Sequence, residues 1–116
     1  LDLDQAQEVA GEVTANGEIC AAANDNAPGQ VVVSGHKAAV ERAIALAKTK
    51  GAKRAVMLPV SAPFHCALMK PAADVMADAL SKVAIKSPAV PVIANVTAST
   101  VVDPDEIRRL LVIKNA

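Results

Sequence analysis

The chain has 116 residues, of which 53 % are hydrophobic and only one is aromatic, so its core must be built from Val, Ala, Leu and Ile. Twelve basic residues balance twelve acidic ones, and aromatic platforms for stacking bases are absent, which argues against nucleic-acid binding. The apolar runs are far shorter than the roughly 20 residues of a membrane-spanning helix. Cys20 and Cys66 form no C-x-x-C pair. We therefore expect a soluble cytoplasmic protein with reduced thiols.

Two helices are predicted in the first half of the chain. Residues 4–15 carry apolar side chains at helical spacing, with Asp4 and Gln7 placed as a capping box. A second helix is expected over about 36–50, capped by Ser34, because its apolar residues fall on one face.

Extended segments alternate with these helices. The runs 18–25 and 30–35 predict a β-hairpin with a five-residue connection rich in Asn, Pro and Gly. Residues 54–60 and 90–96 are apolar without alternation, which is typical of strands covered on both faces.

Two further helices are predicted in the second half. Apolar residues recur at helical spacing over 68–83, with Pro71 tolerated in the first turn. The run 103–106, "DPDE", combines a cap, a proline in the first turn and an acid three residues after the cap, so it starts a helix.

The order of elements predicts an α/β (α+β) fold. Residues 1–60 read α-β-β-α-β, which lacks only an initial strand to be the ferredoxin-like unit β-α-β-β-α-β. The rest reads α-β-α.

His65 lies between a proline-broken apolar run and the third helix, and its role is open from local pattern alone. An isolated His beside apolar residues is most often structural. Neither His65 nor His36 has a second ligand at i+3 or i+4, so no metal site is predicted. Ser61 is four residues away, but Pro63 disfavours the helical turn that would join it to His65.

No nucleophile is identifiable from motif spacing either. Ser34-Gly35 looks like part of a G-x-S-x-G elbow, but the first glycine of that motif is replaced by Val32.

Three blocks carry a family resemblance: "ANDNAPGQVVVSGHKAAVERA", "AKRAVMLPVSAPFHCALMKPAADVMADAL" and "PVIANVTAS". In content, order and spacing they resemble the malonyl-CoA:acyl carrier protein transacylases of bacterial fatty-acid synthesis, from about Leu1 to Leu111. The resemblance implies an α/β-hydrolase-like large part with a ferredoxin-like small part inserted in it. Residues 1–60 then correspond to the small part without its first strand, and residues 61–116 to a β-α segment of the large part.

The same resemblance gives His65 a role. The family's catalytic histidine lies in the segment matched by "SAPFHCALM" and maps onto His65. There it accepts the proton of a serine that attacks the malonyl thioester, and it then protonates the leaving thiol. The malonyl group waits on the serine until the phosphopantetheine thiol of acyl carrier protein takes it. Coenzyme A and phosphopantetheine are thus substrates, and no bound cofactor is expected.

Phe64 is the second implied site residue. In related acyltransferase domains of polyketide synthases, phenylalanine before the catalytic histidine accompanies malonyl units and serine accompanies methylmalonyl units. Phe64 is therefore expected to exclude an α-methyl group, unless it is simply a core aromatic. Because acyl carrier proteins are acidic, Lys53, Arg54 and Lys70 are candidates for carrier binding, with a solvated face as the alternative.

Two functions remain open at this point. The chain is either part of a malonyl transferase, whose serine elbow, carboxylate-binding arginine and oxyanion-hole residues fall outside the matched segments, or an independent ferredoxin-like binding or regulatory module with a structural His65. A G-x-S-x-G segment upstream in the reading frame would discriminate them.

Overall fold

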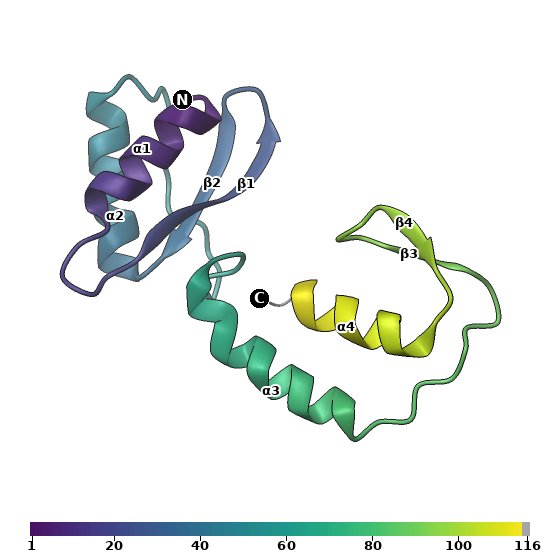
Figure 1. The fold of residues 1–116 in the computed structure, drawn as a ribbon. Helices are drawn as coiled ribbons and strands as arrows, with labels where there is room; N and C mark the ends of the chain where they lie inside the picture. The colour runs from purple at the N-terminus through teal and green to yellow at the C-terminus, as the bar shows by residue number, and fades with distance from the viewer. Residues whose placement is uncertain (115–116) are drawn as a thin grey trace. The chain divides into compact units, whose positions relative to one another are not determined.

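The computed structural model describes residues 1–114, and the chain divides into two compact units, Leu1–Leu68 and Met69–Ala116. The first contains helix α1 (Leu3–Val13), strands β1 (Cys20–Ala27) and β2 (Gln30–Gly35), and helix α2 (Lys37–Thr49) (Figure 1). The second contains helices and a short hairpin. The predicted α/β class is therefore confirmed, with small two-stranded sheets in the described part of the chain.

Helix α1 begins at a capping box, two residues before the predicted one. The Asp2 side chain accepts a hydrogen bond from the Gln5 N–H at 2.8 Å, and the Gln5 side chain accepts one from the Asp2 N–H at 3.1 Å. The predicted capping box of Asp4 and Gln7 is wrong, because Asp2 and Gln5 have the same three-residue spacing and form the box where the helix begins. Asp4 instead lies in the first turn, where its charge favours the positive end of the helix.

Strands β1 and β2 pair antiparallel, with Cys20 opposite Gly35 and Ala27 opposite Gln30. The connection is shorter than the five residues predicted, because the ladder continues to Ala27 through two register shifts and leaves only Pro28 and Gly29 in the turn. Gly29 has φ +78°, a left-handed conformation that glycine adopts without strain.

The junction between α1 and β1 is closed by one side chain. The Thr14 hydroxyl lies 2.8 Å from the Ala10 carbonyl oxygen and 3.0 Å from that of Cys20, and it accepts a hydrogen bond from the Cys20 N–H at 3.0 Å. The end of the helix and the start of the strand thus share a single hydroxyl.

Helices α1 and α2 pack over the hairpin around a core of small side chains. Two alanines, Ala39 and Ala43, are the buried residues of α2, and they let the helices approach closely. The other buried members of this cluster are Val9, Ala10, Val13 and Cys20. Lys50, at the end of α2, pairs with Glu8 and Glu12 of α1.

The predicted cap of α2 is wrong. His36, not Ser34, is its N-cap residue, and no side chain makes a capping hydrogen bond there.

Residues 54–60, predicted as a buried strand, form an irregular segment after α2. Val56, Met57, Leu58 and Val60 are each about half exposed. Within residues 1–114 no strand pairs with this segment, so its backbone groups lack the ladder partners that a strand needs. The Val60 N–H donates locally to the Leu58 carbonyl instead.

The second unit follows a 3-10 turn at Ala67–Met69. Helix α3 (Lys70–Ser81) has Pro71 in its first turn, as predicted. Strands β3 (Val92–Ala94) and β4 (Ser99–Val101) form an antiparallel hairpin, and helix α4 (Pro104–Lys114) starts at the expected position, where the Glu106 N–H donates to Asp103.

Only three residues of the predicted strand 90–96 are extended, and they are not covered on both faces. Ile93 is 74 % exposed, because β4, which the pattern did not indicate, is the only strand that pairs with β3 within residues 1–114. Arg108 of α4 holds the end of α3 by donating to the carbonyl oxygens of Leu80 (2.9 Å) and Val83 (3.0 Å).

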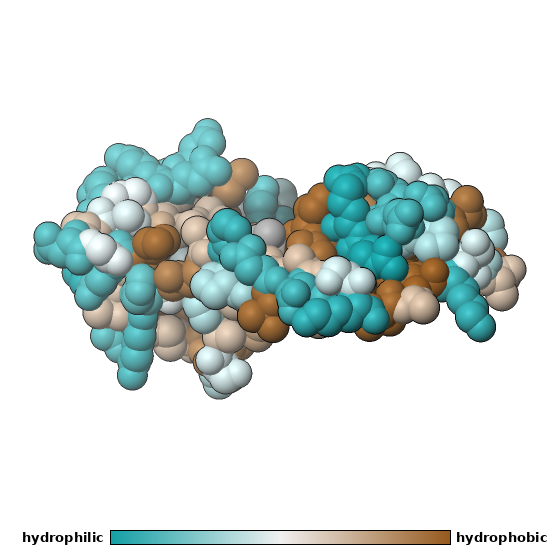
Figure 2. All heavy atoms as spheres, turned by 60° about the horizontal axis from the view of Figure 1, so that its bottom comes forward, coloured by the Kyte–Doolittle hydropathy of each residue, from teal (hydrophilic) through white to brown (hydrophobic). Residues whose placement is uncertain are grey.

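Apolar side chains reach the surface in several places, seen as brown patches in Figure 2. None of the helices within residues 1–114 is long and apolar enough to cross a membrane. The most exposed of the large apolar side chains are Val75, Val90 and Ile93, all in the second unit.

Candidate active site

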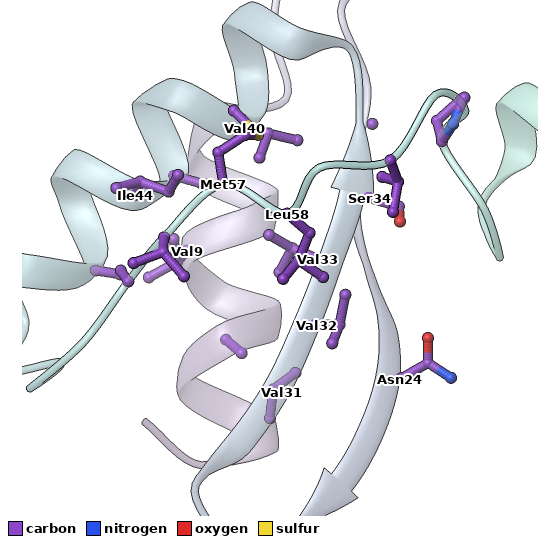
Figure 3. A pocket seen from close by; sticks show the side chains of 18 of the residues that line it. Val9, Asn24, Val31, Val32, Val33, Ser34, Val40, Ile44, Met57 and Leu58 are labelled. Carbon is purple, nitrogen blue, oxygen red and sulfur yellow. The ribbon is translucent and has the colours of Figure 1, made fainter.

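A groove of about 1490 Å³ opens in the first unit between α2, β2 and the segment after α2. Its walls are largely aliphatic and come from all three elements. Figure 3 shows the labelled side chains that line it, among them Val31 and Val33 from β2, Val40 and Ile44 from α2, and Met57 and Leu58 from the segment.

His65 lines this groove together with Ser61 and Phe64. The His65 side chain is exposed, and within residues 1–114 no hydrogen bond is formed by its imidazole. Phe64 is 46 % exposed, so it does not lie in the core. Both predicted site residues therefore border one apolar groove and remain accessible from it.

The loop that carries His65 has a sharply turned backbone. His65 has φ +58°, in the left-handed region that side-chain-bearing residues rarely adopt. On its N-terminal side, the Phe64 N–H donates to the Ala62 carbonyl at 3.0 Å. On its C-terminal side, the Cys66 thiol donates to the Pro63 carbonyl at 3.2 Å, and Cys66 is only 6 % exposed.

The second histidine has a structural role. The Nδ1 atom of His36 accepts a hydrogen bond from the Ile19 N–H at 2.9 Å, and the His36 N–H donates to the Ile19 carbonyl at 2.9 Å. A Cβ atom on Gly35 would lie 2.0 Å from the Ile19 carbonyl oxygen. The Ser34-Gly35-His36 stretch is thus shaped by its close approach to Ile19, which explains a glycine there without a nucleophile elbow.

The other candidate chemistries receive no geometric support. Ser61 and His65 share the groove, but no hydrogen bond joins them in the described residues. Among residues 1–114 no three His, Cys, Asp or Glu side chains come together in a way that could hold a metal ion.

The three candidate carrier-binding residues are separated. Lys53 and Arg54 are exposed and line the same groove as Phe64 and His65. Lys70 lies in the second unit and pairs with Asp74 at 2.9 Å, one helical turn along α3.

Cys66 is the site residue that local sequence patterns missed. The sequence predicts only that the two cysteines are reduced thiols, yet the thiol of Cys66 donates to the Pro63 carbonyl across the turn that contains His65. Burial, together with the nearby Cys66, raises the pKa of the Cys20 thiol, so the Cys20 thiol stays protonated near neutral pH. A cysteine directly after a candidate catalytic histidine, in a loop with two prolines, is the signal that could have indicated this role.

Comparison with known proteins gives consistent matches. The chain is 54 % identical over 101 residues to the malonyl CoA-acyl carrier protein transacylase of Escherichia coli K12, which covers 87 % of this chain and 33 % of that protein. The transacylase of Bacillus subtilis is 44 % identical over 112 residues, 97 % of this chain and 35 % of the relative. No protein-family model matches the chain.

Solved structures agree with these relatives. The acyl-carrier-protein S-malonyltransferase of Burkholderia pseudomallei superposes with a TM-score of 0.83 at 46 % identity, over 100 % of this chain and 38 % of that one. A malonyl-transacylase in complex with its type II PKS acyl-carrier protein gives a TM-score of 0.85 at 45 % identity, covering 99 % of this chain and 37 % of that one. The chain spans about a third of the length of the curated relatives it matches, and the family resemblance seen in the sequence is confirmed.

Proposed function

We propose that this chain, which belongs to the malonyl CoA-acyl carrier protein transacylases as about a third of such a protein, supplies the general base of the transfer reaction. The observation that supports this proposal most strongly has two parts. The chain matches these enzymes along nearly all of its length, and His65, whose imidazole has no hydrogen-bond partner within residues 1–114, lies exposed at an apolar groove. The nucleophilic serine comes from the rest of the enzyme. The reaction moves a malonyl group from coenzyme A to the phosphopantetheine thiol of acyl carrier protein.

The imidazole of His65 carries one proton in each half-reaction. In the first, it accepts the serine hydroxyl proton as the oxygen attacks the thioester carbonyl, and it returns that proton to the departing coenzyme A thiolate. In the second, it takes the proton of the carrier thiol, which attacks the serine ester, and gives it to the serine oxygen. Protons balance across the cycle, so no resident cofactor or metal is needed.

Phe64 acts as the gate for the acyl group. It directly precedes His65, lines the same groove and is half exposed rather than packed in the core. In that position its ring fills the space that an α-methyl branch would need, which favours malonyl over methylmalonyl groups.

Unpaired strand edges in the first unit support a proposal for the fold of the complete enzyme. We assign residues 1–60 to a ferredoxin-like small subdomain and residues 61–116, whose last two lie outside the described residues, to the large acyltransferase subdomain. Within residues 1–114, β2 pairs only with β1, and the apolar segment 54–60 pairs with no strand. A strand from the rest of the enzyme, lying between them, would complete the β-α-β-β-α-β order and cover their exposed aliphatic side chains.

An independent binding module with a structural His65 is the alternative. Structural histidines have ring nitrogens that bond to the fold, as His36 does with Ile19. The imidazole of His65 has no such partner in the described residues, and this difference favours the catalytic role.

The test uses a chimera: the Burkholderia pseudomallei enzyme with its matching segment replaced by this chain. The chimera should transfer labelled malonyl from malonyl-CoA to acyl carrier protein, and His65→Ala should lower kcat by about 10²- to 10⁴-fold. Added imidazole should restore part of this loss. The matched control is His36→Ala, which should lower the melting temperature but retain kcat.

Two outcomes would contradict the proposal. One is a His65→Ala chimera with unchanged kcat, and the other is a folded chimera that transfers no malonyl. The 116-residue chain by itself should acquire no stable malonyl ester, since no serine elbow is present in it.

A further inference from the structure

The backbone at His65 is held in a conformation that its own residue type disfavours. Its φ of +58° brings the β-carbon close to the backbone, which is unfavourable for a residue other than glycine. Such a conformation persists only where surrounding contacts determine it.

The flanking bonds identify the holding group. Pro63 has no N–H to donate and a fixed φ, so it stiffens the entry to the turn. The Cys66 thiol then reaches back three residues to the Pro63 carbonyl at 3.2 Å, and this hydrogen bond encloses Phe64 and His65. Because Cys66 is 6 % exposed, water does not compete for the bond.

Burial also fixes Cys66 itself. Its thiol forms no disulfide bond within the described residues. It lies near Cys20, which belongs to the core formed by α1, β1 and α2. Adjacent residues therefore have opposite environments: Cys66 is buried in the first unit, while His65 remains exposed at the groove.

We propose that Cys66 is a positioning residue for His65: its buried thiol, bonded to the Pro63 carbonyl, holds the left-handed turn that presents the imidazole to the groove. This inference rests on the proposed role of His65 as general base. It assigns Cys66 no contact with substrate and no covalent chemistry. Misplacing a catalytic group by about 1 Å can cost up to about 100-fold in rate, so a modest hydrogen bond can have a large kinetic effect here.

The experiment compares substitutions at Cys66 in the chimera. Cys66→Ala removes the donor and should lower kcat about tenfold or more with the KM for malonyl-CoA unchanged, because ground-state binding is not affected. Cys66→Ser keeps a donor and should restore kcat to within about threefold. Cys66→Val fills the buried site without donating, so it should behave like Cys66→Ala even if the melting temperature is retained.

Two controls separate positioning from general stability. Cys20→Ala removes the other buried thiol and should lower the melting temperature while changing kcat by less than about twofold. In a His65→Ala background, Cys66→Ala should cause no further loss of kcat, since a residue that acts through His65 has nothing left to position.

The outcomes distinguish this inference from the function on which it rests. If His65→Ala retains kcat, the proposed function fails. If His65→Ala is inactive but both Cys66→Ala and Cys66→Val keep full kcat, only the positioning role fails. A Cys66→Ser variant as slow as Cys66→Val would also overturn it, as would additive losses in the double variant.

Discussion

The His36 side chain and the Ile19 backbone are joined by a reciprocal pair of hydrogen bonds. Ile19 donates its N–H to Nδ1 of His36 at 2.9 Å, and the His36 N–H donates to the Ile19 carbonyl at 2.9 Å. The pair lies directly beyond the last β1–β2 ladder pair, Cys20 and Gly35, and it holds His36, the N-cap residue of α2. It assigns the two histidines of the chain to different tasks, one in the fold and one at the groove.

Replacing His36 should therefore affect stability rather than chemistry. His36→Ala leaves the partly buried Ile19 N–H without its acceptor, and we expect it to destabilise the first unit by about 1–2 kcal/mol. The measurement is the urea midpoint of the chimera followed by circular dichroism. Lys37→Ala, on an exposed neighbour, is the control. An unchanged midpoint for His36→Ala would show that the Ile19 bond carries no net stability.

Phe64→Ser tests the acyl gate. Opening the space beside His65 should raise the relative use of methylmalonyl-CoA by about tenfold or more, because one methyl group in an apolar pocket is worth roughly 1–3 kcal/mol of discrimination. The ratio of kcat/KM values for the two thioesters, measured on the chimera with and without the change, reports this directly. If Phe64 only packs in the fold, both values should fall in parallel and the melting temperature should drop.

Lys53 and Arg54 test the carrier side of the reaction. Both are exposed at the groove, so reversing them to Glu should repel an acidic carrier protein and raise its KM. The malonyl-CoA half-reaction, followed by labelling of the enzyme in the absence of carrier, should be unaffected. Lys86→Glu, on an exposed lysine that is not a candidate for carrier binding, provides a matched charge reversal. Equal effects on both half-reactions would argue against a carrier-binding surface here.

Glu106 gives a pH-dependent prediction in α4. The hydrogen bond from Arg109 lowers the pKa of the Glu106 carboxyl below its ordinary value of 4.5. Because the pKa is lower in the folded state, the ion pair contributes its full stabilisation at pH values above the ordinary pKa of 4.5. This contribution is lost as the pH falls through the folded-state pKa. A carbon-detected NMR titration should place the Glu106 midpoint below 4.5, and Arg109→Gln should move it upward. A midpoint that does not respond to Arg109→Gln would exclude the pair as the cause.

Local signals in the sequence predicted the helices better than the strands. Capping residues and Pro71 act within one turn, so the positions of α3 and α4 follow from near neighbours. Residues 54–60 carry a strand-like composition, but a strand needs a pairing partner, and no strand pairs with them in the described part of the chain. The composition of a segment indicates whether it can be a buried strand, but it does not show whether a partner strand is present.

The candidate site shows a similar division. His65 and Phe64 could be selected from the sequence only through the family resemblance, since isolated histidines have no distinguishing pattern. The roles of His36 and Cys66 depend on contacts with Ile19 and Pro63. The first of these spans 17 residues, which no local pattern encodes.

The Thr14 hydroxyl, shared between Ala10 and Cys20, has a consequence for the order in which this unit forms. Its partners are four and six residues away, so closing the α1–β1 junction requires only a short loop and costs little chain entropy. The contacts between Lys50 and α1, by comparison, must bring together residues 38 or more positions apart. Contacts of low sequence separation form first when stabilities are similar. The junction at Thr14 is thus expected to be an early point of folding, on which α2 docks afterwards.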